Sequence, residues 1–348
     1  MDARAHERRG AGEVRLEVAA YRLPLLALGF VSLAFGVAGG LARFSALDVP
    51  ASAVALHGPL MVSAFFGTLI SLERAVALGR LWGYGAPLAA GLGGVCLLAG
   101  FLLPGFSLLV AAAALFVACA VALARRQPSL ETTTLLLGAA AWLAGNVMLL
   151  EGGAAVPWWI AFFVLTIAGE RLELSRYLRR PPWVRRAFAV LVFALVLSPL
   201  IPRALGVVLV ALAAWLLAFD LARVTIRQER LPRYVAACLL AGYVWLGLGG
   251  ALIALATAYD AALHAIFVGF VLSMVFGHAP VILPAVLRVR FPYHPLLYLP
   301  LALLHASLAL RVFVSAPAGG WGNAAAIALF IASALGLTLI KGRARAGR

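Results

Sequence analysis

Long apolar runs that recur along nearly the whole chain are the feature that most restricts its fold. A membrane-spanning α-helix needs about 20 consecutive apolar residues, and about twelve such runs follow one another here between short polar loops. The composition agrees, because 64% of the residues are hydrophobic and only 12% are charged, whereas a soluble domain is about half apolar and about a quarter charged. We predict an all-α, polytopic membrane protein whose spans are residues 22–42, 53–72, 84–103, 105–124, 131–150, 156–173, 186–202, 204–222, 234–256, 260–284, 296–314 and 323–340.

The basic residues predict how these spans are oriented. With a cytoplasmic N-terminus, all of the 28 lysines and arginines fall on the cytoplasmic side except Arg43, Arg203 and Arg311. Short cytoplasmic loops of membrane proteins carry such an excess, which explains the net charge of +15 without a nucleic-acid partner. We therefore expect a lipid bilayer as the surroundings, a bacterial or archaeal-type cytoplasmic membrane, and both termini in the cytoplasm. The expected parts are a basic tail at 1–20, one membrane domain at 21–340 and a second basic tail at 341–348.

Three of the predicted spans show a weak internal sequence repeat. The second span ends in Leu72-Glu73-Arg74, the sixth ends in Gly169-Glu170-Arg171, and the tenth has Gly277-His278 near the same level. This spacing favours a pseudo-threefold repeat of four-helix units in which spans two, six and ten are equivalent. It is equally consistent with Glu-Arg simply marking two cytoplasmic helix ends.

Histidines inside the apolar runs are the most informative polar residues. A titratable ring in hydrocarbon is costly unless it is hydrogen-bonded or ligates something. His57 and His264 each lie about four residues beyond the outer end of a span that runs inward, so both rings are expected about 5–8 Å below the outer boundary. Two imidazoles at equal depth suit axial ligation of one low-spin haem b. The alternative is that each ring only hydrogen-bonds to a neighbouring helix.

Two of the three outer arginines adjoin the helices that carry these histidines. Arg43 ends the first span and Arg311 ends the eleventh. Haem propionates need cations, so both arginines are predicted propionate contacts. The alternative is that they are ordinary interfacial caps, or that they pair with Asp48 and Asp260.

A second set of polar residues is expected near the inner face. His278 lies fourteen residues after His264, about 21 Å along a helix, so the two cannot share a site. An inner cluster could bind a metal or a second haem, or relay protons; alternatively its carboxylates simply pair with Arg74 and Arg171. His305, mid-span, could join His278 or pack alone. The candidate residues of this inner cluster are Glu73, Glu170, His278 and His305.

Short motifs around these histidines resemble two known families. His57-Gly58-Pro59-Leu60-Met61 resembles the His-Gly-x-x-Met segment of the haem-copper oxidase catalytic subunit. That resemblance implies a twelve-helix, pseudo-threefold bundle with a low-spin haem near the outer face, ligated by His57 and His264. The chain also resembles the NnrS family of twelve-span haem proteins associated with nitric-oxide stress. There the matching residues are His57 with Met61, the segment His264-Ala265-Ile266-Phe267-Val268-Gly269, and Gly277-His278.

The departures from the oxidase pattern limit the predicted function. Spans six and seven contain no histidine for the oxidase copper site, and Ala262 stands where the ligand of the oxidase's second haem is expected. We predict an integral membrane haem b protein in electron transfer or nitric-oxide-related metabolism, with a quinol or a cytochrome as electron donor. Whether it is an enzyme stays open; if it is, the class is oxidoreductase. The alternatives are a cofactor-free transporter and an assembly subunit of a respiratory complex.

Overall fold

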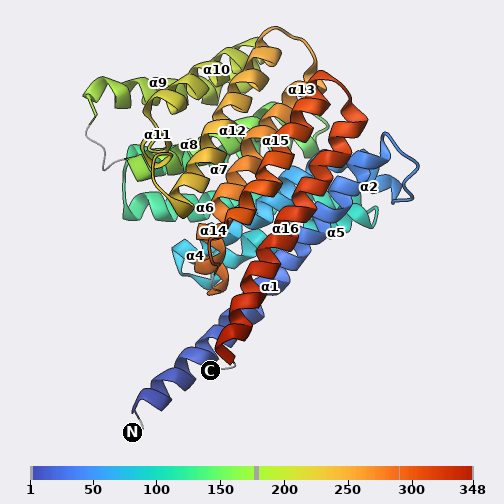
Figure 1. Ribbon diagram of the computed structural model, residues 1–348. Helices are drawn as coiled ribbons and strands as arrows, with labels where there is room; N and C mark the ends of the chain where they lie inside the picture. The colour runs from blue at the N-terminus through green and yellow to red at the C-terminus, as the bar shows by residue number, and fades with distance from the viewer. Residues whose placement is uncertain (1–2, 176–179, 290, 347–348) are drawn as a thin grey trace. The chain divides into compact units, whose positions relative to one another are not determined.

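The computed structural model describes residues 3–175, 180–289 and 291–346, and this part of the chain is helical without any β-strand (Figure 1). The all-α prediction is therefore confirmed. Four arginines that the charge argument assigned to the cytoplasmic side lie outside the described residues: Arg176, Arg179, Arg290 and Arg348.

Ten helical segments in the described residues are long and apolar enough to cross a membrane, which indicates a multi-pass membrane protein. Two further predicted spans are also helices. The helix α8 (Val156–Ser175) carries Glu170, Arg171 and Glu173 near its end, and the apolar part of α10 (Pro202–Phe219) is shorter. The ten segments are Arg22–Ala42, His57–Leu78, Leu81–Leu98, Leu102–Arg126, Leu130–Leu150, Pro182–Leu200, Arg230–Ala254, Tyr259–Leu287, Pro295–Phe313 and Ala316–Thr338.

The chain divides into two compact units. Unit 1 consists of Met1–Phe116 with Pro280–Phe291, and unit 2 of Val117–Ala279 with Pro292–Arg348. Most long helices belong to one unit, but α6 (Leu102–Arg126) and α14 (Ser273–Leu287) each begin in one unit and end in the other.

Unit 1 is built around the long helix α1 (Ala3–Ala42). It packs against α5 (Gly85–Leu98) and against one interrupted helix made of α3 (His57–Pro59), η1 (Leu60–Phe66) and α4 (Gly67–Leu78). Glycines permit this close approach, because a Cβ on Gly39 would overlap the backbone of Ala53 in α2 (Ala51–Ala55). Small residues at helix contacts are typical of membrane bundles, where backbones approach closely.

The turn between α5 and α6 corrects one predicted boundary. The sequence suggests a break at Pro104-Gly105, but the chain turns at Gly100, whose φ of +86° is a conformation that glycine adopts readily. Pro104 instead lies in the first turn of α6, where its missing N–H removes no helical hydrogen bond.

Unit 2 consists of helix pairs. The most extensive contacts join α10 to α12 (Arg230–Ala254), α7 (Leu130–Leu150) to α8, and α15 (Tyr298–Phe313) to α16 (Ala316–Ala346). A Cβ on Gly206 would overlap the backbone of α12, so α10 and α12 also approach through glycine.

The remaining short elements and one longer helix of the chain are η2 (Leu81–Tyr84), α9 (Pro182–Leu197), η3 (Ser198–Leu200), α11 (Ala222–Thr225), α13 (Tyr259–His264), η4 (Ala265–Leu272) and η5 (Pro295–Leu297).

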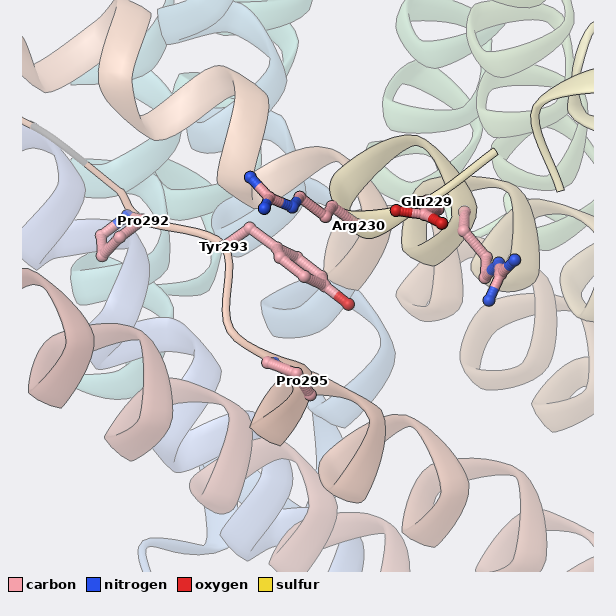
Figure 2. Close-up of a pocket in the computed structure, with 6 residues that line it drawn as sticks. Glu229, Arg230, Pro292, Tyr293 and Pro295 are labelled. Atoms are coloured by element: carbon pink, nitrogen blue, oxygen red, sulfur yellow. The ribbon is translucent and has the colours of Figure 1, made fainter. Parts of the chain in front are cut away.

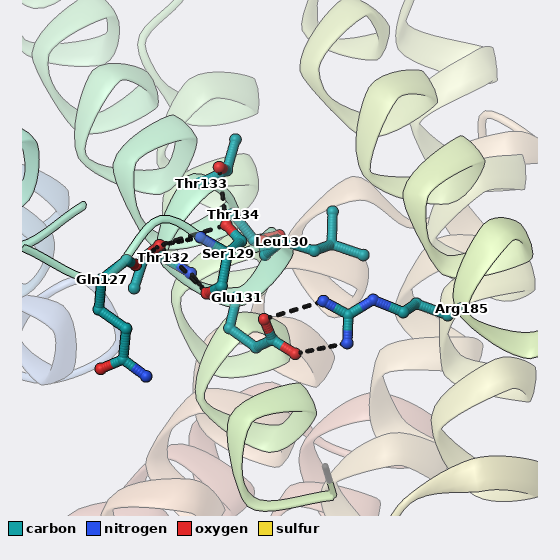
Figure 3. A network of polar contacts seen from close by, with 8 residues as sticks. All are labelled: Gln127, Ser129, Leu130, Glu131, Thr132, Thr133, Thr134 and Arg185. Atoms are coloured by element: carbon teal, nitrogen blue, oxygen red, sulfur yellow. Dashed lines mark hydrogen bonds and ion pairs between the residues drawn. The ribbon is translucent and has the colours of Figure 1, made fainter. Parts of the chain in front are cut away.

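The start of α7 is fixed by a network of short polar contacts (Figure 3). The Ser129 hydroxyl accepts from the Thr132 N–H at 3.2 Å, and the Thr132 hydroxyl accepts from the Ser129 N–H at 3.1 Å. This reciprocal arrangement is a capping box, which satisfies two otherwise unpaired donors. Two hydrogen bonds of 3.0 and 3.1 Å then join the Arg185 guanidinium of α9 to the Glu131 carboxylate. The network thus ties α9 to the first turn of α7.

Candidate functional site

His57, the predicted haem ligand of unit 1, begins α3 and is half-buried. Its Nδ1 lies 2.6 Å from the Gly36 carbonyl oxygen of α1. A carbonyl oxygen can only accept, so Nδ1 carries the proton, and the lone pair of the neutral ring is on Nε2. Histidines that ligate metals are commonly held in this way through their other ring nitrogen.

A pair of glycines on α1 makes room for the His57 segment. A Cβ on Gly40 would lie 2.8 Å from Cε1 of His57, and a Cβ on Gly36 would lie 2.8 Å from Sδ of Met61. Both distances are too short for real side chains. The four-residue spacing of the glycines matches that of His57 and Met61, since residues four apart share one helix face. Neither glycine was predicted to contact the His57 segment, although the small-xxx-small pattern is a signal that the sequence contains.

The predicted propionate contact Arg43 holds the chain just before His57. One of its Nη atoms donates to the carbonyl of Val54 at 2.9 Å. Val54 belongs to the short helix α2, which ends at Ala55, two residues before His57 begins α3. Arg43 is exposed, and this partner is a backbone carbonyl rather than a carboxylate.

His264, the second predicted ligand, ends α13 in unit 2. Its Nδ1 lies 2.8 Å from the Asp260 carbonyl oxygen and 3.4 Å from the Asp260 carboxylate. The same reasoning places the lone pair of the neutral ring on Nε2. Arg311 donates to the same carboxylate at 3.0 Å and to the Ala316 carbonyl at 3.2 Å. Arg311 therefore pairs with Asp260, which the sequence analysis gave as the alternative to a propionate contact.

Each of these two histidines is followed by a π-helical segment. In unit 1 η1 (Leu60–Phe66) starts right after Pro59, and in unit 2 η4 (Ala265–Leu272) starts at the residue after His264. π-helical turns are rare and occur frequently at functional sites. Pro59 lacks an N–H, which is a local cause for the irregular ladder of η1; η4 contains no proline.

A buried ion pair lies in unit 2 near the end of α8. Arg171 and Asp220 are joined by two hydrogen bonds of 3.0 and 3.1 Å, and their side chains are only 4% and 1% exposed. The Asp220 carboxylate also accepts from the Ala222 N–H at 2.6 Å. Arg171 thus pairs with Asp220 rather than with its sequence neighbour Glu170, which corrects the alternative stated for this residue.

Further polar groups of unit 2 surround this pair. The fully buried Tyr243 lies beside both charges, and His278 lies within electrostatic reach of Glu170, Arg171 and Asp220. The predicted grouping of Glu170 with His278 stays a prediction, and the parts played by Asp220 and Tyr243 were not predicted.

The loop after α8 brings a second guanidinium to this region. Arg180 lies over the Phe219 ring at 5.6 Å. Burial and the neighbouring Arg223 lower the pKa of the Arg180 guanidinium, and the carboxylate of Asp220 counteracts this.

His305 takes part in a hydrogen-bond network within unit 2. Its Nδ1 accepts a hydrogen bond from the Trp245 indole at 3.0 Å, and its Nε2 lies 3.3 Å from the Ser273 hydroxyl, which donates to the Cys238 carbonyl. Both ring nitrogens are therefore engaged, and His305 links α12, α14 and α15 within unit 2. This arrangement does not support His305 as a metal ligand.

The predicted inner metal site stays a prediction, and nothing among the described residues adds support to it. Within the described part of the chain, no group of three or more histidine, cysteine, aspartate or glutamate side chains is arranged to hold a metal ion. Glu73 belongs to unit 1, whereas Glu170, His278 and His305 belong to unit 2.

Comparison with known proteins gives a family without an activity. The family described as Domain of unknown function (DUF8744) matches residues 22–339, and because this covers most of the chain, the protein belongs to that family. No curated protein and no solved structure matches. The matched region begins in α1 and ends in α16, so it includes every candidate residue described above.

Proposed function

We propose that this member of the DUF8744 family is an integral membrane haem b protein whose axial ligands are His57 and His264. The observation that carries the proposal is the state of the two rings, each considered within its own unit. In both, Nδ1 is bonded to a backbone carbonyl, so that the lone pair of the neutral ring is on Nε2. Two such imidazoles are a suitable donor set for a low-spin haem iron.

The membrane topology is the second part of the proposal. We take α8 and α10 as two further spans, the sixth and the eighth along the chain, which brings the total to twelve, because both occupy predicted apolar runs and both are helical. Both termini are then cytoplasmic, in a bacterial or archaeal-type cytoplasmic membrane, and both histidines lie near the outer face. The resemblance to the NnrS family and to the haem-copper oxidase subunit supports the same arrangement.

The surrounding residues have defined tasks under this proposal. Gly36 and Gly40 give His57 the space to present its ring, while Asp260, held by Arg311, accepts from His264 and increases the basicity of its ring. A haem with two imidazole ligands exchanges one electron without opening a coordination position. Electron transfer, with a quinol or a cytochrome as donor, therefore fits this donor set better than activation of a bound ligand.

An absorbance spectrum tests the proposal directly. We expect the protein purified from haem-replete cells to show sharp low-spin b-type bands in a dithionite-reduced minus oxidised spectrum. His57→Ala and His264→Ala should each abolish these bands. His294→Ala is the matched control, because His294 lies in a loop where its Nδ1 accepts from the Leu296 N–H.

Two results would overturn the haem assignment. One is a colourless wild-type protein that is monodisperse by size-exclusion chromatography. The other is a pair of monodisperse alanine variants that retain the bands at wild-type intensity.

The buried ion pair favours a second candidate, a cofactor-free transporter. Ionisable side chains within membrane proteins commonly line ion or proton paths, and Arg171, Asp220 and Tyr243 are all buried in unit 2. This candidate predicts a colourless protein. It also predicts that Asp220→Asn abolishes proton uptake in proteoliposomes while leaving the protein monodisperse, whereas haem-mediated electron transfer predicts no such uptake in the wild type.

A further inference from the structure

A cavity in unit 2 combines basic side chains with the ends of two apolar helices. It measures about 660 Å³ and is lined by Glu229, Arg230, Arg233, Pro292, Tyr293 and Pro295. Small-molecule sites commonly have volumes of about 300–1,000 Å³. Neither the histidines nor the buried ion pair takes part in it.

The lining favours an anion. The lining contains two guanidinium groups and one carboxylate, that of Glu229, so the charge of the lining is positive. Arg233 is held by a 2.7 Å hydrogen bond from its Nε to the Gln228 carbonyl, which orients its guanidinium group. In Figure 2 the Arg230 side chain extends towards Pro292 and Tyr293 and away from the Glu229 carboxylate. Guanidinium groups bind phosphate oxygens through paired N–H donors.

The backbone at this cavity is unusual as well. Arg230 is the first residue of α12 and has a φ of +58°, a left-handed conformation that non-glycine residues rarely adopt. Strained residues of this kind cluster at binding and active sites. Pro292 and Pro295 stiffen the opposite wall, because proline fixes its own φ.

The position of the cavity identifies the source of the anion. Arg230 begins the apolar segment Arg230–Ala254, and Pro295 begins the apolar segment Pro295–Phe313. The cavity therefore lies where two apolar helices begin, at the depth of lipid headgroups, and on the side where the basic residues gather. Basic pockets at that level between membrane helices bind anionic lipid headgroups.

We propose that this cavity binds the phosphate ester headgroup of an anionic phospholipid, with Arg230 and Arg233 contacting the phosphate and Tyr293 donating its hydroxyl. The inference rests on the proposed membrane topology and not on the proposed haem. Loss of the haem bands and loss of lipid binding are separate readouts, so either proposal can fail while the other stands.

Lipid binding to the full-length protein tests the inference. In phosphatidylcholine nanodiscs with added phosphatidylglycerol, native mass spectrometry should detect retained phosphatidylglycerol in the wild type. The double variant Arg230→Gln/Arg233→Gln should weaken this binding at least about tenfold, as loss of two charge-assisted contacts requires. The control Arg223→Gln/Arg227→Gln removes the same charge from two exposed arginines outside the cavity and should change binding less than about twofold.

Three outcomes would overturn the inference. Retention of phosphatidylcholine to the same extent as phosphatidylglycerol would show that the cavity does not select an anionic headgroup. Undiminished phosphatidylglycerol binding by the cavity variant would exclude this cavity as the site. Binding of free glycerol phosphate as tightly as the lipid would assign the cavity to a soluble phosphate ester instead.

Discussion

The two units hold their predicted haem ligands by different means. In unit 1 the His57 ring bonds to a carbonyl of another helix, α1, and lies against its glycines. In unit 2 the His264 ring bonds within its own helix and to a carboxylate that Arg311 also binds. His57 is thus oriented by shape and His264 by charge, so changes in volume should disturb the first and changes in charge the second.

A similar contrast separates two arginines of unit 1 from two arginines of unit 2. Arg22 and Arg43 of unit 1 donate to the backbone carbonyls of Val286 and Val54. Arg171 and Arg185 of unit 2 bind the carboxylates of Asp220 and Glu131. A backbone carbonyl remains as an acceptor when the side chain of its residue is substituted. A carboxylate is lost when its residue is substituted, and the guanidinium group then lacks its counter-ion.

The largest effect is expected from Asp220→Asn in unit 2. It leaves the Arg171 charge buried without its counter-ion, a change that typically costs about 3–5 kcal/mol. Chemical unfolding in detergent measures the loss. Glu131→Gln is the matched comparison, because its partner Arg185 is 53% exposed and water can solvate the remaining charge. Equal destabilisation by the two variants would show that burial of the pair does not matter.

Gly40→Val should have the next largest effect, and it tests the shape argument in unit 1. Its Cβ would lie 2.8 Å from the His57 ring, and overpacking of this kind costs about 1–3 kcal/mol. We expect a lower unfolding midpoint and, under the haem proposal, loss of the reduced haem bands. Gly336→Val is the control, since a Cβ there meets nothing within 4 Å. A Gly40 variant as stable and as coloured as the control would contradict the shape argument.

Asp260→Asn should have a smaller effect on stability and tests the charge argument in unit 2. Asp260 is 64% exposed, so the pair with Arg311 is screened and is worth at most about 1 kcal/mol. Loss of a hydrogen-bond partner of a ligating histidine lowers metal affinity about 10–100-fold. For Asp260→Asn we expect haem affinity, measured by titration, to fall about tenfold. Raising the salt concentration should reduce the difference from wild type. A difference that is insensitive to salt would remove the electrostatic explanation.

Arg43→Gln should change stability least, by about 0.5 kcal/mol or less, because it removes one exposed hydrogen bond. The unfolding midpoint measures this. Haem retention gives an independent result for the same variant. A clear loss of haem without a loss of stability would support the predicted propionate contact, whereas unchanged haem retention would limit Arg43 to holding α2.

Much of the helical arrangement was predictable because its signals are local. Apolar runs of sufficient length gave helices in each predicted stretch. The turn at Gly100 was not predicted, since Gly100 and Pro104-Gly105 both favour turns and packing decides between them. Of the two π-helical segments, η1 follows Pro59, whereas η4 contains no proline and has no comparable sequence signal.

The candidate sites were predictable only where one residue carried the signal. His57 and His264 were evident as rings in apolar runs, but their Nδ1 partners are backbone atoms, which every residue possesses. The partner of Arg171 was missed because sequence proximity suggested Glu170. Adjacent residues on a helix do not face the same neighbour, and Asp220 lies 49 positions further along the chain.

The π-helical segments have a consequence for changes in chain length. A π-helix bonds each carbonyl five residues ahead instead of four, so it is an α-helix that accommodates a surplus residue. Deleting one residue from η1 (Leu60–Phe66) or η4 (Ala265–Leu272) can restore the α pattern and leave the flanking side chains on their original faces. The same deletion in α4 (Gly67–Leu78) would rotate every following side chain by about 100°. Natural variants that lack one residue in either histidine-bearing helix should therefore carry the gap within η1 or η4.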